Sequence, residues 1–269
     1  MDYTKDLELA LKLADIADKI SLERFYAQDL HVETKPDATP VTDADRSVEQ
    51  ALKAELKNSR PDDSLIGEEF GTTGENLHGQ GSRTWIIDPI DGTANFMRGV
   101  PVWATLIALA VDGKPVVGVV SSPAMGRRWW AAPGAGAHTR HIDGRIVQIK
   151  VSEISELETA SLSYNSLKLW DEAGMLDALM NLTRKVWRTR AYGDFWAYML
   201  LAEGALEITS EHNLAIYDIA ALVPIVTEAG GRITDLNGEL SVNSSSVLAT
   251  NSKLHSVVSE ILNHPNLRN

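Results

Sequence analysis

The stretch WIIDPIDGTANF, residues 85–96, places two acids at the end of an apolar run. The segment Trp85–Ile87 is typical of a short buried strand. Asp88 follows it directly, at the carboxyl end of that strand, where ligands collect in α/β folds. Pro89 has no backbone N–H, so we expect it to end the strand's hydrogen bonding. The turn that follows lets Asp88 and Asp91 face one point, and the stretch predicts a pair of converging carboxylates.

Gly92 and Thr93 follow the second acid, and a helix could begin there. The free backbone N–H groups in the first turn of a helix favour an anion. One short loop therefore offers two hard oxygen ligands for a divalent cation beside a place for a phosphate group. Mg2+ suits this arrangement because it usually takes one or two carboxylates together with phosphate oxygens of a substrate.

Other acids have suggestive surroundings: Glu68 and Glu69 in SLIGEE, Asp43 and Asp45 in PVTDADRSVE, and Asp218 in AIYDIAAL. Asp218 lies near the start of an otherwise apolar helix, where the helix dipole stabilises an acid but burial requires a partner. Taken singly, most of the 37 acids are expected at the solvated surface. Asp43, or Thr42 before it, is expected to cap the helix that follows. Glu69 is expected at the surface or in a supporting position, not as a direct metal ligand.

Composition excludes several classes of site. The chain has 269 residues, 25 basic and 37 acidic, and a net charge of −12, which disfavours nucleic acid and anionic membranes as partners. It has no cysteine, so disulfides, cysteine-ligated zinc, iron–sulfur clusters and thiol nucleophiles are excluded. The first twenty residues lack the pattern of a secretory signal, and the apolar run 102–111 is too short to span a bilayer. A cytoplasmic protein is expected.

The patterning along the chain changes near residue 145. The first part predicts helices over about residues 4–28 and from Asp43, strands at 64–69 and 84–89, and a hairpin at Asp112-Gly113. After residue 150, strands alternate with helices, including single helices over 167–182 and 215–231. We therefore expect an α+β half, residues 1–145, with most metal ligands. We expect residues 146–269 to form an α/β half with the residues that set substrate specificity and one metal ligand.

Three blocks together resemble one family: WIIDPIDGTANF, the GEE at 67–69, and YDIAALVPIVTEAGG at 217–231. The sequence resembles the inositol monophosphatase-like family of Mg2+-dependent phosphatases over nearly its whole length, including TKPDATPVTDADRSVE at 34–49. The resemblance implies a layered αβαβα fold, which combines the α+β and α/β halves, with the site between them. It also implies a homodimer, a small-molecule phosphate ester as substrate, and two to three Mg2+ ions for which Mn2+ could substitute.

Site roles follow from the resemblance, position by position. The metal ligands it implies are Glu68, Asp88, the Ile90 carbonyl, Asp91 and Asp218. Asp45 and Thr93 match the pair that orients and deprotonates the attacking water, with Glu68 the third catalytic residue. Asp91 and the N–H groups of Gly92 and Thr93 are implied to hold the phosphate, and Lys35 matches a lysine on a mobile loop. Metal pairs in such sites lie about 3.5–4 Å apart, so a shared carboxylate is needed, and Asp88 is the natural bridge.

The resemblance also implies that the second half of the chain sets the substrate preference. YGDFWAY, EGALEI and the block at 217–231 resemble the bacterial histidinol-phosphate phosphatase branch of the family. The substrate-binding residues implied are Arg190, Asp194, Glu211 and Asp218. Histidinol phosphate carries an ammonium group and an imidazole, which Asp194 and Glu211 could receive. In an equally weighted alternative, Asp194 only caps the helix that starts there.

The sequence leaves three alternative functions to compare with histidinol-phosphate hydrolysis. Inositol 1-phosphate or another sugar phosphate is the nearest alternative substrate, although Tyr217 replaces the tryptophan that is usual before the metal-binding Asp. A non-catalytic protein that binds metal or phosphate ligands is expected to have lost Asp45, Thr93 or a metal-binding acid, and all are present. A dinucleotide-binding oxidoreductase is disfavoured because PGAGAH, residues 133–138, has only two spaced glycines and follows a hairpin.

Overall fold

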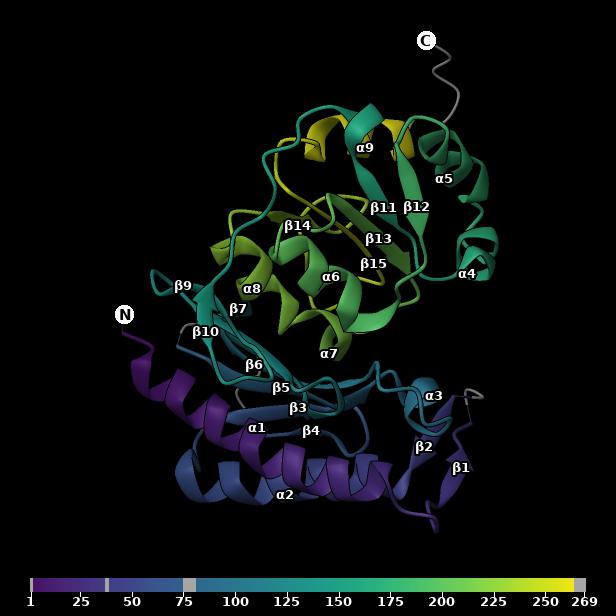
Figure 1. The fold of residues 1–269 in the computed structure, drawn as a ribbon. Coiled ribbons are helices and arrows are strands. Elements are labelled where there is room, and N and C mark those ends of the chain that lie inside the picture. The colour runs from purple at the N-terminus through teal and green to yellow at the C-terminus, as the bar shows by residue number, and fades with distance from the viewer. Residues whose placement is uncertain (1, 37–38, 75–80, 264–269) are drawn as a thin grey trace. The chain divides into compact units, whose positions relative to one another are not determined.

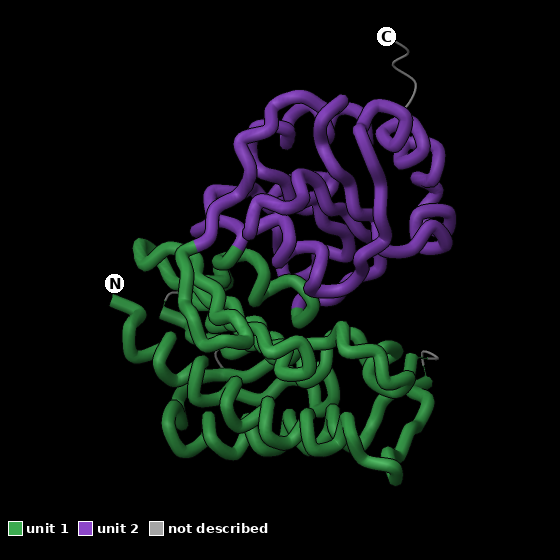
Figure 2. The backbone as a smooth tube through the Cα atoms, in the orientation of Figure 1, with its two compact units in different colours: residues 1–148, 217–225 green, residues 149–216, 226–269 purple. Residues whose placement is uncertain are grey.

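The computed structural model describes residues 2–36, 39–74 and 81–263, which form two compact units. Figure 2 shows unit 1, residues 1–148 and 217–225, in green and unit 2, residues 149–216 and 226–269, in purple. Residues 217–225, which contain Asp218, thus group with unit 1 although they lie late in the sequence. The division into domains near residue 145 stays a prediction, because compactness alone does not show independent folding.

Unit 1 is built on an eight-stranded sheet with the order β10-β9-β8-β7-β6-β5-β3-β4. Its strands are β3 (Ser64–Gly67), β4 (Gly71–Thr73), β5 (Arg83–Asp91), β6 (Ala104–Val111), β7 (Lys114–Ser122), β8 (Arg127–Ala132), β9 (Gly136–Arg140) and β10 (Ile146–Gln148). The β3–β5 pair is parallel and the other neighbours are antiparallel. The predicted hairpin at Asp112-Gly113 is confirmed, since both residues have positive φ, 52° and 75°, at the turn between β6 and β7.

Helices α1 (Thr4–Phe25) and α2 (Asp43–Ser59) lie side by side over one face of this sheet (Figure 1). A small ribbon, β1 (Val32–Thr34) with β2 (Pro40–Thr42), joins them. Alternate strand residues share the core with these helices: Leu65, Trp85, Ile87, Ile107, Leu109, Val117 and Val119. Because side chains alternate along a strand, Ile86 and Asp88 belong to the opposite face. The strand register therefore directs Asp88 away from the helices.

The start of α2 is fixed by a capping box. The Thr42 hydroxyl accepts from the N–H groups of Ala44 and Asp45, and the Asp45 carboxylate accepts from Thr42 N–H at 2.8 Å. Thr42, rather than Asp43, is therefore the capping residue, and Asp43 pairs with Arg24 at 2.6 Å. The cap also locks the orientation of the buried Asp45 carboxylate.

Segment 217–225 packs against the second face of the sheet. A side chain at position 118 would point at this segment. A Cβ added to Gly118 would lie 2.2 Å from the Ala221 carbonyl oxygen and 2.6 Å from Pro224 Cγ. Gly118 is not in the left-handed region, so the glycine is required for space and not for conformation. This close approach brings Asp218 onto the same face as Asp88.

Gly118→Ala is expected to destabilise the protein by about 1–3 kcal/mol, because the new methyl group overlaps backbone that cannot rotate away. Urea unfolding measures the change. Lys114→Ala, which removes an exposed side chain from the same strand, is the control and should change stability little. Equal stability of Gly118→Ala and the wild type would contradict the close packing of segment 217–225.

Unit 2 contains a mixed five-stranded sheet with the order β12-β11-β13-β15-β14. The strands are β11 (Ser161–Ser163), β12 (Arg188–Arg190), β13 (Ile208–His212), β14 (Arg232–Thr234) and β15 (Ser246–Thr250). The helices of unit 2 are α4 (Leu167–Glu172), α5 (Leu176–Thr183), α6 (Asp194–Ala202) and α9 (His255–Asn263). The short helix α3 (Thr93–Phe96) belongs to unit 1, and α7 (Ile216–Ile219) and α8 (Leu222–Glu228) lie mostly in segment 217–225 of unit 1. β11 runs parallel to β12 and β13, whereas β15 is antiparallel to β13 and β14.

Two of the helices predicted from the sequence are in fact broken. Gly174, with φ +69°, separates α4 from α5. Pro224 lies in the first turn of α8, where its missing N–H is harmless; in one continuous helix it would clash with the carbonyl of Ala220. The predictions of single helices over 167–182 and 215–231 were therefore wrong.

His255 is buried in unit 2, and its ring nitrogens lie 3.1 Å from the hydroxyls of Thr234 and Thr250. Burial, together with the charge of Arg232, lowers the pKa of His255 to about 4. In the unfolded chain, the pKa of His255 is near 6.5. The contribution of neutral, buried His255 to the free energy of unfolding is therefore complete above pH 6.5 and is lost as the pH falls towards 4. We expect a loss of about 2–3 kcal/mol between pH 7.5 and 4.5 from this residue.

Urea unfolding of the wild type and His255→Gln at both pH values isolates this contribution. The wild type should lose more stability on acidification than the variant, because glutamine does not titrate. Identical pH dependence of the two proteins would contradict a buried neutral His255.

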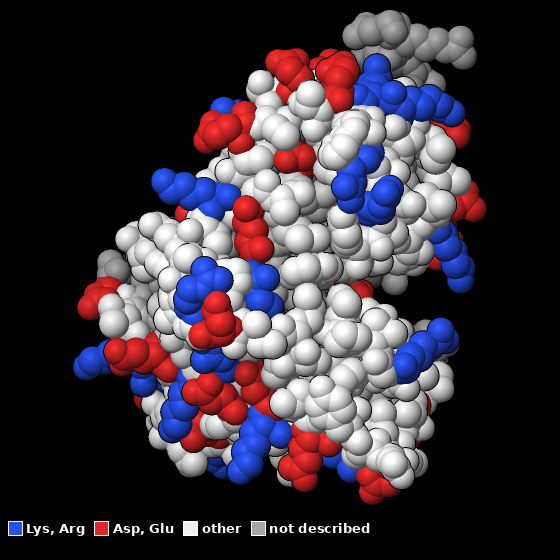
Figure 3. Space-filling view, viewed as in Figure 1, with Lys and Arg blue, Asp and Glu red and all other residues white. Residues whose placement is uncertain are grey.

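Among the described residues, no helix combines the length and the apolar character that crossing a membrane requires. On the face drawn in Figure 3, basic and acidic side chains are interspersed over α1 and α2. The pair Lys12–Glu55, at 2.7 Å, links these two helices. The described part of that face therefore lacks the continuous positive charge that is typical of nucleic-acid binding.

Candidate metal and phosphate site

A β-bulge at the end of β5 brings the two acids of DPIDGT together. The register with β6 shifts between Asp88, opposite Leu106, and Asp91, opposite Ala104. The Ile90 N–H donates to Asp88 Oδ1 at 2.9 Å, which holds the turn inside the bulge. Pro89 therefore does not end the ladder as predicted: its missing donor falls within the bulge, and pairing resumes at Asp91.

Asp88, Asp91 and Asp218 each offer a carboxylate oxygen, and these oxygens lie within 4.8 Å of one another. Asp88 is 2% exposed, whereas the other two are half-buried. Burial raises the pKa of Asp88 well above its ordinary value, and the charges of Glu68, Asp91 and Asp218 raise it further. Four acids that oppose each other's ionisation favour a cation in their midst.

Glu68 belongs to this group through Asp88, whose pKa its negative charge helps to raise. It follows Gly67 at the end of β3, which is parallel to β5, so strand alternation places both acids on the same sheet face. The carbonyl of Ile90, the other expected ligand, accepts from the Thr93 hydroxyl at 3.0 Å. All the ligands predicted for metal are thus brought together within unit 1.

Thr93 begins α3 directly after Gly92, whose φ of +85° turns the chain out of the strand. The Thr93 hydroxyl lies 3.3 Å from Asp45 Oδ1 as well as 3.0 Å from the Ile90 oxygen. The structure thereby connects the capped start of α2 to the acidic loop. This hydroxyl and the Asp45 carboxylate form a hydrogen-bonded pair beside the predicted metal ligands.

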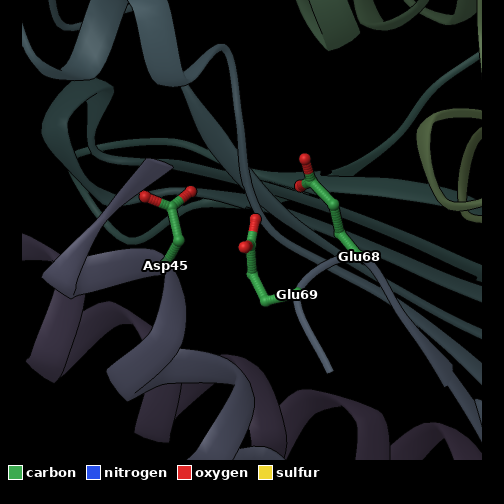
Figure 4. Close-up of side chains that lie close together, drawn as sticks. All are labelled: Asp45, Glu68 and Glu69. Carbon is green, nitrogen blue, oxygen red and sulfur yellow. The ribbon is translucent and has the colours of Figure 1, made fainter. Parts of the chain in front are cut away.

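A second acidic group consists of Asp45, Glu68 and Glu69, with oxygens within 4.8 Å of one another. Figure 4 shows Asp45 rising from the first turn of α2, and Glu68 and Glu69 from the segment after β3. Burial raises the pKa of Asp45 to about 6 and that of Glu69 to about 7. Glu69, expected to be a surface or supporting acid, is therefore in the cluster itself.

Lys35 is the cation of this second group. Its Nζ lies 2.7 Å from Glu68 and 2.5 Å from Glu69. Burial lowers the pKa of Lys35, but its hydrogen bonds to the two glutamates outweigh burial and raise the pKa overall. One ammonium group thus balances part of the negative charge and holds both carboxylates.

Tyr217 lies beside the same acids, since Glu68, Asp218 and Asp88 all act on its hydroxyl. Burial raises the pKa of Tyr217, and those charges raise it further. The hydroxyl consequently stays neutral and is available as a hydrogen-bond donor.

The donor set fits Mg2+. Every candidate ligand is a carboxylate or carbonyl oxygen, the type that this hard cation prefers. Neither group contains a histidine among the described residues, and the chain has no cysteine, so softer metals gain nothing here. Buried like charges also provide the electrostatic reason for binding a divalent ion.

Three of the residues predicted to bind substrate, Arg190, Asp194 and Glu211, lie in unit 2, whereas the fourth, Asp218, groups with unit 1. Arg190 ends β12 and is exposed, Asp194 begins α6 soon after it, and Glu211 lies in β13. Between them, Asn165 follows β11 and donates to Glu211 Oε2 at 2.6 Å. Parallel strands place these residues at one edge of the sheet.

Asp194 is the first residue of α6. The capping position is Gly193, with no side-chain capping bond, and Asp194 itself has φ +49°. A non-glycine residue in the left-handed region costs free energy and commonly marks a functional position. Burial also raises the pKa of Asp194 to about 6. The choice between a substrate contact and helix capping stays a prediction for Asp194.

The family is shown by comparison with known proteins. The model of the Inositol monophosphatase family matches residues 2–265. The chain belongs to the inositol monophosphatase family. The family's known members include a solved inositol monophosphatase from Zymomonas mobilis, with 33% identity and a TM-score of 0.84, where the match covers 98% of this chain and 99% of that one. The layered fold expected from the sequence is confirmed by this likeness.

Within the family, the chain is similar to two histidinol-phosphatases. That of Streptomyces coelicolor is 51% identical over 271 residues, covering 99% of each chain. That of Mycobacterium tuberculosis is 52% identical over 258 residues, covering 96% of this chain and 98% of its own. The predicted resemblance to this branch of the inositol monophosphatase family is confirmed.

Sequence reasoning missed Glu49 at this family site. Its carboxylate is fully buried and accepts from the N–H groups of Glu69 and Phe70. A signal existed: Glu49 follows Asp45 by four residues, so both acids share the helix face beside the apolar stripe that includes Val48.

Proposed function

We propose that this protein is a Mg2+-dependent phosphate monoester hydrolase whose substrate is histidinol phosphate, which it converts to histidinol and phosphate. The observation that carries the proposal is the convergence of Asp88, Asp91 and Asp218 in a chain about half identical to two histidinol-phosphatases. Such an enzyme acts in histidine biosynthesis.

Two to three Mg2+ ions would be held by Glu68, Asp88, the Ile90 carbonyl, Asp91 and Asp218, and Mn2+ could replace them. When bound, the metal supplies positive charge that polarises the ester and makes water more acidic. Asp88 is the acid that two ions would share, because it is the most buried and interacts with Glu68, Asp91 and Asp218. Lys35 then keeps Glu68 and Glu69 in place.

Thr93 and Asp45 would orient and deprotonate the attacking water. The single hydroxyl proton of Thr93 lies between two acceptors, the Ile90 oxygen at 3.0 Å and Asp45 Oδ1 at 3.3 Å. With the Ile90 carbonyl engaged by a metal, the proton would point to Asp45, and the threonine oxygen would accept a hydrogen bond from water. A proton from water can pass to Thr93 Oγ1 as the threonine proton moves to Asp45 Oδ1. With a pKa of about 6, Asp45 is poised for this role near neutral pH. Asp91 and the N–H groups of Gly92 and Thr93 would position the phosphate.

Asp194 and Glu211 would bind the ammonium and imidazole groups of histidinol phosphate, with Arg190 and Asp218 completing the substrate contacts. Two acids opposite in charge to the ammonium group and to a protonated imidazole explain a preference that the phosphate alone does not give. Asn165, by donating to Glu211, fixes the direction of that carboxylate.

We also propose a cytoplasmic homodimer with domains divided near residue 145. The intersubunit partner is a second copy of the chain. Size-exclusion chromatography with light scattering tests this part, and a monomer at micromolar concentration would contradict it.

Phosphate release with Mg2+ tests the substrate. Histidinol phosphate and inositol 1-phosphate are compared at matched concentrations, with and without EDTA. The proposal predicts a higher kcat/KM for histidinol phosphate and loss of both activities on chelation. Preference for inositol 1-phosphate would show an inositol monophosphatase of the same family, and metal-independent hydrolysis would contradict the mechanism.

Asp194→Asn and Glu211→Gln are expected to raise KM for histidinol phosphate by about tenfold each, because a charge-assisted contact is worth about 1.5–3 kcal/mol. Hydrolysis of inositol 1-phosphate, whose alcohol part carries no charge, is the internal control, and its KM should change less. Unchanged KM for histidinol phosphate in both variants would contradict these assignments.

A further inference from the structure

Glu49 is a buried acid that the proposed chemistry does not use. It lies in the second turn of α2 and is 0% exposed. Its two carboxylate oxygens accept from backbone N–H groups, Oε2 from Glu69 at 2.7 Å and Oε1 from Phe70 at 3.0 Å. Hydrogen bonds to an ionised acceptor are stronger than neutral ones. The side chain thus fastens the backbone just after β3 to helix α2.

Gly67 makes room for this contact. A Cβ at Gly67 would lie 1.9 Å from Glu49 Oε1 and 2.3 Å from its Cδ. Gly67 is not in the left-handed region, so its backbone conformation does not require glycine. The absence of a side chain at Gly67 is therefore explained by the carboxylate packed against it.

We propose that Glu49 is a positioning residue for the metal site: by holding the backbone at Glu69 and Phe70, it fixes where Glu68 and Glu69 point. The inference rests on the proposed function, since it concerns the same site. The backbone needs this anchor because the negative charges of Glu68 and Asp88 repel each other. Without the anchor, the repulsion would favour Glu68 turning away from Asp88.

One helix thereby aligns two parts of the site. Asp45, one turn before Glu49 on α2, accepts from the Thr93 hydroxyl after β5. Glu49 accepts from the segment after β3. The spacing of four residues sets the distance between these anchor points along α2. A shift of α2 would therefore move both ends of the site together.

Glu49→Gln tests the inference. The amide oxygen can accept from only one of the two N–H groups, and the amide NH2 faces the other. We expect the dissociation constant for Mn2+, measured by titration calorimetry without substrate, to rise by about tenfold to a hundredfold. Hydrogen exchange at the amides of Glu69 and Phe70 should accelerate. Glu55→Gln, on the same helix but paired with Lys12, removes the same charge and should leave both measurements unchanged.

A double-mutant cycle uses Gly67 as an independent probe. Gly67→Ala should weaken Mn2+ binding and lower the unfolding temperature in the wild-type background. In a Glu49→Ala background the same change should cost much less, because the overlapping carboxylate is gone. If the Glu49 variants fail to fold, Mn2+ binding by Gly67→Ala alone, with Glu49 retained, still tests the inference.

Four outcomes separate the possibilities. Weaker Mn2+ binding with faster amide exchange in Glu49→Gln supports the positioning role. Reduced thermal stability with unchanged Mn2+ affinity overturns it and leaves Glu49 a structural residue, as does an equal cost of Gly67→Ala in both backgrounds. Failure of the wild type to bind Mn2+ overturns the proposed metal-dependent function as well.

Discussion

Asp88→Asn is expected to lower kcat for histidinol phosphate by about a thousandfold at saturating Mg2+. A metal stabilises the charge of the transition state by several kcal/mol, and each 1.36 kcal/mol is a factor of about ten in rate. Asp88 is the buried centre of the cluster, and it interacts with Glu68, Asp91 and Asp218. Asparagine keeps the shape of the side chain but not its charge. Steady-state phosphate release and Mn2+ titration measure the two losses.

The same variant should be more stable than the wild type in EDTA. In the metal-free protein at pH 7, Asp88 must either take up a proton or bury a charge beside other acids, and both cost free energy. Because folding raises the pKa of Asp88, the wild type should recover stability relative to the variant as pH falls towards 4. A gain of about 1 kcal/mol corresponds to a rise of about 2–4 °C in Tm.

Glu207→Gln is the matched control for Asp88→Asn. Glu207 is also buried, but it lies in unit 2, where it accepts from the Ser161 N–H at 2.7 Å. Its replacement should leave Mn2+ affinity and kcat near those of the wild type. Full activity of Asp88→Asn would contradict the metal site, whereas a metal-free variant less stable than the wild type would contradict the electrostatic argument alone.

Asp45→Asn should lower kcat by about a hundredfold to ten-thousandfold, the range that a positioned general base contributes. The asparagine oxygen can still accept from the Thr42 N–H, so the cap of α2 is kept and Tm should change little. The amide NH2 would instead donate towards Thr93 Oγ1, which reverses the hydrogen bond and removes the proton acceptor.

Substitutions at Thr93 complete that test. Thr93→Ser retains the hydroxyl and should keep most of the activity, whereas Thr93→Val should resemble Asp45→Asn. Combining Asp45→Asn with Thr93→Val should cost little more than either change alone, because the two residues act as a unit. Fully additive losses would show that they act separately.

The acidic centre was predictable because its signals are local. In DPIDGT, two acids lie at the end of an apolar strand, and the Gly92-Thr93 turn follows within the same loop. Strand alternation then accounts for Glu68 facing the same side as Asp88. The hairpin at Asp112-Gly113 was equally local, since positive φ at both residues favours those amino acids.

The features that sequence reasoning missed depend on contacts between distant segments. Gly118 gives no sign that segment 217–225 packs on it, because the overlap appears only when both are placed on one sheet. Glu49 reads as an ordinary helix acid until the backbone of Glu69 is seen 2.7 Å away. The helix break before Leu222 could have been predicted from the sequence, since Pro224 excludes a continuous helix through Ala220.

A crystal of the protein soaked in millimolar Mn2+ and phosphate tests the central claim most directly, by anomalous diffraction at the manganese edge. The account predicts an anomalous peak coordinated by Asp88, Asp91 and Asp218, the three acids whose oxygens lie within 4.8 Å of one another. Density for the metal elsewhere, or no peak among these carboxylates, would contradict it.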